Sequence, residues 1–124
     1  MIKAKTIGRW RLTLAAASLA MVAQPLQAAP QYCDGKIQEM FHDHLGVVYV
    51  YPTFRSNWIA ICNVNASWNG ITPELCKAWI SEVLSIILAD KPVTMYYNHI
   101  DVASCATIPA YANAPAPGYI MVRK

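Results

Sequence analysis

The chain has 124 residues and a formal net charge of +3, with 56% hydrophobic and 14% charged residues. Four of its ten basic residues lie within the first eleven positions, so residues 29–124 carry six basic and seven acidic side chains and a net charge near −1. This balance excludes any argument from basic charge toward binding of nucleic acid or of an anionic membrane.

The first 28 residues have the three-part pattern of a secretory signal peptide. The basic residues of the leader are Lys3, Lys5, Arg9 and Arg11. An apolar run follows over residues 12–23, and at about 12 residues it is too short to span a bilayer comfortably. Pro25 and the small residue Ala28 complete the pattern, and no cysteine marks a lipoprotein anchor. We predict cleavage after Ala28, export to the periplasm or the medium, and one domain over residues 29–124 without a membrane span.

All four cysteines lie in the predicted mature domain: Cys33, Cys62, Cys76 and Cys105. An even count in a small exported chain indicates disulfide bonds. Four thiolates could also hold zinc, but the spacings of 29, 14 and 29 residues contain no close ligand pair. The sequence therefore favours two disulfides, and no cofactor is expected.

The first half of the domain predicts three strands, rich in β-branched and aromatic residues and separated by turn signals. Residues 29–32 read as a lead-in and residues 33–35 as a turn. The predicted strands cover residues 36–42, 47–54 and 58–63, with turns over residues 43–46 and 55–57. Pro52 cannot donate to a sheet, so that end of the second strand is predicted to lie at an edge or a bulge.

A polar loop over residues 64–71 leads into the clearest local signal, a helix over residues 73–89. Thr72 can cap it, Pro73 suits its first position, and Glu74 complements the helix dipole. The predicted buried face contains Cys76, Trp79, Ile80, Val83, Leu84, Ile87 and Leu88. The sequence Asp90-Lys91-Pro92 ends the helix, because a residue before proline is pushed out of helical geometry.

Two further strands follow, over residues 93–98 and 119–122, with a proline-containing loop over residues 108–117 between them. The order strand–strand–strand–helix–strand–strand matches a small five-stranded OB-like barrel, mainly β with one helix. In that barrel the first strand pairs antiparallel with the fourth, which brings Cys33 near Cys105. Cys62 and Cys76 flank the loop into the helix, so the predicted disulfides are Cys33–Cys105 and Cys62–Cys76.

Several short motifs resemble a family of short exported bacterial proteins that have four cysteines and no assigned activity. The residues that carry this resemblance are Ile61-Cys62, Trp68-Asn69-Gly70-Ile71, Cys76-Lys77-Ala78-Trp79, Val93, Tyr97, Ser104-Cys105 and Pro117-Gly118-Tyr119. In strand order and size the chain is also similar to the ring-forming, glycan-binding B subunits of bacterial toxins. This second likeness is an analogy of architecture, and it implies an oligomer that binds glycans.

A metal site and an enzyme are the weaker alternatives. His42 and His44 could hold Zn²⁺ or Cu²⁺ together with His99 or Asp101, but a solvated polar turn explains the two histidines as well. The chain has no Gly-x-Ser-x-Gly motif and no suggestive pair of carboxylates, and its cysteines are predicted to be oxidised. The prediction is therefore a protein that is not an enzyme.

Aromatic residues give the better functional signal, since eight tyrosine and tryptophan side chains occur in the mature domain. Some of them must fill the core. Trp58, Trp68 and Tyr111 fall at a strand start or on loops, where rings can stack on a sugar or a protein partner. We therefore predict an exported, disulfide-stapled binding module whose partner is an unidentified protein or glycan, with these three residues in its site.

Overall fold

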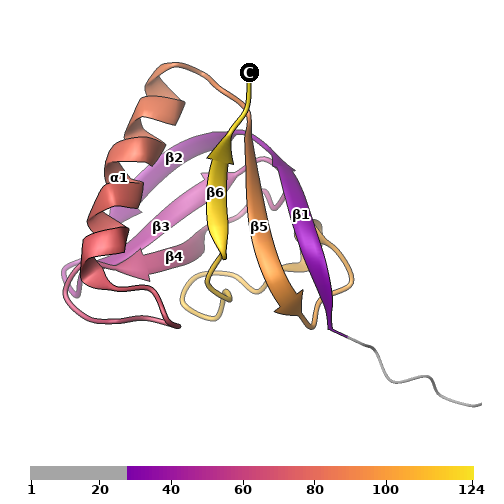
Figure 1. The fold of residues 1–124 in the computed structure, drawn as a ribbon, viewed down its shortest axis with the longest axis horizontal. Coiled ribbons are helices and arrows are strands. Elements are labelled where there is room, and N and C mark those ends of the chain that lie inside the picture. Colours follow the sequence, from indigo (N-terminus) through magenta and orange to yellow (C-terminus); the bar gives the residue numbers. More distant parts are fainter. Residues whose placement is uncertain (1–27) are drawn as a thin grey trace, which may run out of the picture.

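The computed structural model describes residues 28–124, so the predicted signal peptide lies outside the described residues except for Ala28. The strands are β1 (Ala29–Gly35), β2 (Ile37–His42), β3 (Val47–Pro52), β4 (Ile59–Asn63), β5 (Val93–Ile100) and β6 (Tyr119–Val122). One α-helix, α1 (Pro73–Leu88), and a short 3-10 helix, η1 (Cys105–Thr107), complete the described elements. Figure 1 shows β1, β5 and β6 in front of β2, β3 and β4, with α1 along one side.

The strands form two antiparallel three-stranded sheets, with the orders β1-β5-β6 and β2-β3-β4. The prediction of a five-stranded OB-like barrel is therefore wrong, because there are six strands and neither sheet closes on itself. The predicted first strand, now β2, pairs with β3 and not with β5. The neighbour of β5 is β1, whose residues were predicted to be a lead-in and a turn.

Two residues in β1 concealed it in the sequence. Pro30 lies at a shift in register between Ala29 and Gln31, and proline is tolerated at such bulges and on edge strands. Gly35 ends β1 at the point where the chain bends into β2. Both residues indicate turns in a sequence, and both occupy strand positions here where the sheet does not need a donor or a large side chain.

The helix follows its sequence signals closely. The Thr72 side chain accepts a hydrogen bond from the Leu75 amide at 3.3 Å, Pro73 holds the first helical position, and the helix ends at Leu88. The helix packs against β2 and β4. Its buried residues are Cys76, Trp79, Val83 and Ile86. Leu84 and Leu88, which were predicted to widen the buried face, are exposed because the stripe at this spacing is narrower than expected.

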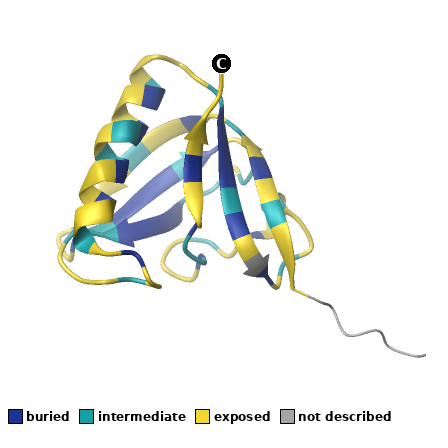
Figure 2. Cartoon of the chain, in the orientation of Figure 1, coloured by how far each residue is buried: buried dark blue, intermediate teal, exposed yellow. Residues whose placement is uncertain are grey.

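The hydrophobic core lies between the two sheets and α1. Its large residues include Ile59 and Ile61 of one sheet, Met95 and Tyr97 of the other, and Trp79 of the helix. Figure 2 shows that β3 and β4 are largely buried, whereas β1 and β6 are mostly exposed. The sheet β2-β3-β4 is therefore the better-covered of the two.

Two disulfides join parts of this arrangement, and both predicted pairings are confirmed. Cys33 of β1 is bonded to Cys105 of η1, with their Cα atoms 5.6 Å apart. Cys62 of β4 is bonded to Cys76 of α1, with a Cα separation of 5.4 Å. Each sheet is thus tied by one bridge to an element outside it. Among residues 28–124, no helix has the length and apolar character needed to cross a membrane.

Candidate functional site

Five aromatic side chains meet on the side of the sheet β2-β3-β4 that faces away from the core. Tyr49 and Tyr51 alternate along β3 with the core residues Val48 and Val50. Phe41 of β2 is the cross-strand neighbour of Tyr49. Trp58, directly before β4, and Tyr111, on the loop before β6, complete the set. We call Phe41, Tyr49, Tyr51, Trp58 and Tyr111 the five-ring cluster.

The rings of the cluster form a continuous chain of contacts. Phe41 and Tyr49 are stacked with centroids 4.8 Å apart and an interplanar angle of 19°. Trp58 meets Phe41 edge-on at 4.7 Å and Tyr51 edge-on at 5.3 Å. Tyr111 approaches Tyr49 edge-on at 6.0 Å. These stacked and edge-to-face geometries are the ones that aromatic pairs favour, so the cluster is an ordered surface.

Tyr111 is held in the cluster by its own backbone. Its N–H donates to the Trp58 carbonyl at 2.7 Å, and its carbonyl accepts from the Ala60 amide at 3.1 Å. These bonds make a one-residue parallel bridge along the edge of β4. Tyr111 has φ of +52°, a left-handed conformation that costs a bulky residue about 1–2 kcal/mol. Strain of this kind, fixed by surrounding bonds, is found most often at functional sites.

The cluster has a covered centre and an open margin. Tyr49 is only 8% exposed although it points away from the core, because neighbouring rings cover it. Burial, followed by the nearby charge of Asp43, raises the pKa of the Tyr49 hydroxyl. That hydroxyl donates to the Asp43 carboxylate at 3.4 Å. Phe41 and Tyr111 are 39% and 51% exposed, so a partner would meet these two rings.

The structure brings together two of the three residues predicted to bind a ligand. Trp58 and Tyr111 are both in the cluster, where Phe41 and Tyr49 connect them. Trp68 has no ring contact among the described residues. It begins a tight turn closed by two backbone hydrogen bonds to Ile71, at 3.0 and 2.9 Å.

Phe41, Tyr49 and Tyr51 were missed as site residues. The alternation of β3 and the turn over residues 43–46 set the register that places all three on one face. That register was a usable signal in the sequence.

The other sheet also carries aromatic side chains on its outer side. Tyr32, Tyr96 and Tyr119 are cross-strand neighbours on β1, β5 and β6. The Tyr96 ring lies 5.0 Å from that of Tyr32 and is stacked at 4.8 Å on that of Tyr119. Gly118 leaves room for this arrangement, since a Cβ there would lie 3.0 Å from the Tyr96 ring. We call these three residues the tyrosine row.

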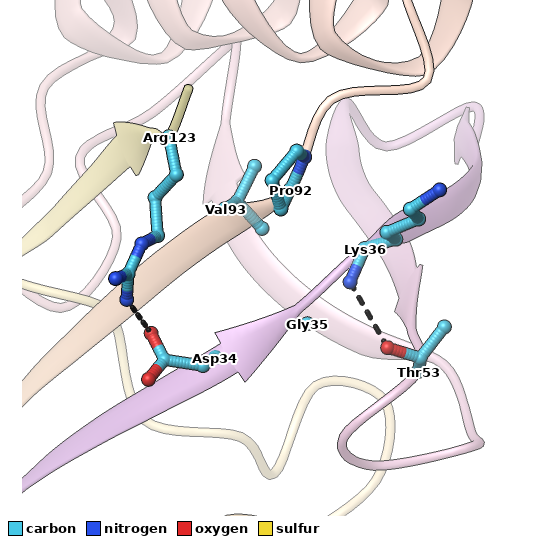
Figure 3. Close-up of a pocket in the computed structure, with 7 residues that line it drawn as sticks. All are labelled: Asp34, Gly35, Lys36, Thr53, Pro92, Val93 and Arg123. Atoms are coloured by element: carbon cyan, nitrogen blue, oxygen red, sulfur yellow. Dashed lines mark hydrogen bonds and ion pairs between the residues drawn. The ribbon is translucent and has the colours of Figure 1, made fainter.

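A hollow of about 410 Å³ lies at the bend between β1 and β2, and Figure 3 shows its lining. Its charges pair with protein groups: Asp34 with Arg123 at 2.9 Å, and the Lys36 ammonium with Asp90 at 2.8 Å. The Lys36 amide donates to the Thr53 hydroxyl at 2.9 Å, and the Thr53 amide donates back to the Lys36 carbonyl at 2.8 Å.

A Cβ on Gly35 would lie 2.5 Å from the Thr53 hydroxyl oxygen, so glycine is needed at this bend. The groups around the hollow are therefore committed to holding the corner between the two sheets.

The metal alternative finds no assembled site in the part of the chain that is described. No group of three or more histidine, cysteine, aspartate or glutamate side chains lies close enough together there to hold an ion. His42 and His44 are exposed on either side of Asp43. The side chain of His99 is outside the description. A metal centre and an enzymatic activity stay as untested predictions.

Comparison with known proteins adds no assignment. No protein family, no curated protein and no solved structure matches the chain. The two likenesses drawn from the sequence therefore remain expectations, and the function has to be argued from the site itself.

Proposed function

We propose that the protein is an exported binding module and that the five-ring cluster is the surface that contacts its partner. The observation that carries the proposal is Tyr111, a large exposed residue that three backbone hydrogen bonds hold in a left-handed conformation above the sheet. The third of these bonds runs from the Ala114 amide to the Tyr111 carbonyl at 3.1 Å. Packing of the core does not require this ring, because it lies on the opposite side of the sheet.

The composition of the cluster suits recognition. Tyrosine and tryptophan offer a large apolar area together with a polar group, and they are the residues that most often dominate binding energy at interfaces. Four of the five rings are one or the other. The neighbouring carboxylate of Asp43 and the backbone bonds of Tyr111 fix the rings before a partner arrives, which lowers the entropic cost of binding.

Export is the second part of the proposal. Its support is the three-part pattern of the leader and the two disulfides, which persist in oxidising compartments. Intact mass of the protein recovered from the periplasm or medium should correspond to a start at Ala29. Recovery with Met1 retained would contradict export through this leader.

The binding proposal is tested by two screens of the purified protein expressed from the full chain, one on a glycan array and one on a peptide array. Binding in either screen should be lost in Trp58→Ala and kept in Tyr32→Ala, which alters the tyrosine row instead. Binding that survives Trp58→Ala would contradict the assignment of the surface. Absence of binding in both screens would contradict the proposed function.

A ring-forming glycan binder is the alternative prediction. No feature of the described residues favours it over the binding module. Mass measured under native conditions tests it directly, because a ring of the toxin B type should assemble without a ligand.

A further inference from the structure

A second hollow lies beside the five-ring cluster, between the end of β5 and two loops. Its volume is about 410 Å³, within the range typical of small-molecule sites. Asn69 contributes from the turn before α1, Asp101 from the end of β5, and Asn113 from the loop that carries Tyr111. We call it the loop hollow.

Both loops around the loop hollow are fixed by backbone bonds. Asn69 and Gly70 have φ of +46° and +84° and form the tight turn that the Asn-Gly sequence favours. The bonds between Trp68 and Ile71 close that turn, and the bonds of Tyr111 anchor the opposite loop. The hollow therefore exists before any ligand binds, which reduces the cost of binding.

The lining combines an apolar floor with polar side chains that have no protein partner. Ile100 and Ala114 are buried and form the apolar part together with Pro109 and Pro115. Within residues 28–124, the side chains of Asn69, Asp101 and Asn113 have no hydrogen-bond or ion-pair partner in the protein. An amide can both donate and accept, and a carboxylate accepts strongly from hydroxyls. Such a set matches a ring that has an apolar face and a rim of hydroxyl groups.

The charge of the lining narrows the ligand further. Asp101 is the one charged residue that lines the loop hollow, and no lysine, arginine or histidine does so. An anionic ligand such as a uronate, a sialic acid or a nucleotide would meet a like charge without a compensating cation. The lining therefore favours a neutral ligand.

We propose that the loop hollow binds one neutral sugar ring, a hexose or an N-acetylhexosamine, with hydrogen bonds to Asn69, Asp101 and Asn113. Tyr111 directly precedes Ala112, another lining residue, so the loop hollow and the five-ring cluster are continuous along the chain. A longer glycan could place one ring in the hollow and the next against Tyr111. The inference rests on the proposed function, since it names glycan as the class of partner.

The test is saturation-transfer NMR on the protein expressed from the full chain. The probes are D-glucose, D-galactose, D-mannose and N-acetyl-D-glucosamine, with D-glucuronate and N-acetylneuraminate as anionic counterparts. At least one neutral sugar should bind, and the anionic ones should bind about tenfold more weakly or not at all. Amide signals of Asn69, Asp101 and Asn113 should shift during the titration.

The variants separate the loop hollow from the rest of the surface. Asn113→Ala should weaken binding of the neutral sugar about tenfold, and Asp101→Asn should weaken it while reducing discrimination against the anionic probes. Asp90→Asn is the matched control, because this exposed carboxylate lies before β5 and Asp101 lies after it. It should leave binding unchanged.

Two outcomes would overturn the inference. Sugar binding that is insensitive to Asp101→Asn and Asn113→Ala but lost in Trp58→Ala would place the sugar on the five-ring cluster, and the proposed function would stand. Failure of every neutral sugar would remove glycan as the partner of the loop hollow. The peptide-array result would then decide whether the proposed function fails as well.

Discussion

The two sheets carry aromatic surfaces of different origin. In the tyrosine row, all three rings come from strands, and each is the direct cross-strand neighbour of the next. In the five-ring cluster, only Phe41, Tyr49 and Tyr51 come from strands. Trp58 precedes β4, and Tyr111 is brought across the sheet by a loop.

The register of the sheet is sufficient to explain the tyrosine row. Neighbouring strands place side chains about 4.5–5.5 Å apart, so three tyrosines in register must contact each other. Register does not explain Tyr111, whose position needs a left-handed backbone and a bridge to β4. The comparison teaches that contact between exposed rings is weak evidence for a site, whereas a ring delivered by a strained and anchored loop is stronger evidence.

The largest expected effect concerns the bridge of the less covered sheet. Cys33→Ala with Cys105→Ala opens a loop of 72 residues and should lower the free energy of unfolding by about 4 kcal/mol, against about 3 kcal/mol for Cys62→Ala with Cys76→Ala. Denaturant titration measures both losses. In the first variant, hydrogen exchange should accelerate more in β1, which pairs only with β5, than in β3. Equal acceleration in the two strands would contradict the separation of the sheets.

The second effect concerns the centre of the tyrosine row. Tyr96 contacts two rings and Tyr32 contacts one. Tyr96→Ala should therefore cost about 2 kcal/mol and Tyr32→Ala about 1 kcal/mol, since each aromatic pair contributes about 0.5–1.5 kcal/mol beyond area burial. Thermal and urea unfolding give both values. A row that serves a partner rather than the fold would show no loss in either variant.

The third effect lies on the inner side of the same sheet. Tyr97 is fully buried, burial raises the pKa of its hydroxyl, and that hydroxyl has no hydrogen-bond partner among the described residues. Removing an unsatisfied buried polar group restores about 1 kcal/mol. Tyr97→Phe should therefore raise the urea midpoint with an unchanged slope. A lower midpoint would indicate that the hydroxyl is satisfied in solution.

The smallest effect is a dependence on pH at the end of the row. The hydroxyl of Thr94 donates to Asp34, and Arg123 pairs with the same carboxylate, so the pKa of Asp34 is held below its ordinary value of 3.8. A lowered pKa contributes stability above pH 3.8 that is lost as the pH falls through the value in the folded state. Asp34→Asn should thus be less stable than the wild type at neutral pH, and the difference should vanish in acid. A difference that persists below pH 3.8 would contradict this account.

Signals confined to one segment were readable from the sequence. The helix depends on Thr72, Pro73 and the spacing of Cys76, Trp79 and Val83, and it formed within one residue of the predicted end. The disulfides were also predicted correctly, although the reason was partly wrong. Cys33 lies inside β1 rather than before the first strand, and it is the pairing of β1 with β5 that brings it to Cys105.

Properties that depend on pairing between distant segments were not readable. Pro30 and Gly35 indicate turns in isolation, and only the bulge and the contact with Thr53 show why a strand tolerates them. The same limit applies to the site. Trp58 and Tyr111 are 53 positions apart in the sequence, and the backbone bond between them at 2.7 Å is what unites them. Trp68 has the same local character as Trp58 but lies outside the cluster, so an aromatic residue next to a turn was insufficient to identify a site.

The most direct test of the central claim compares one tyrosine from each surface. Tyr111 and Tyr119 are 51% and 40% exposed, and asparagine tolerates the left-handed backbone that Tyr111 occupies. Tyr111→Asn and Tyr119→Asn should both fold, and affinity for the ligand found on the glycan or peptide array is the quantity to measure. The account predicts that Tyr111→Asn weakens binding at least about tenfold, as loss of a central aromatic contact does, while Tyr119→Asn leaves it unchanged. Equal affinity in the two variants, or loss only in Tyr119→Asn, would contradict the assignment of the binding surface to the five-ring cluster.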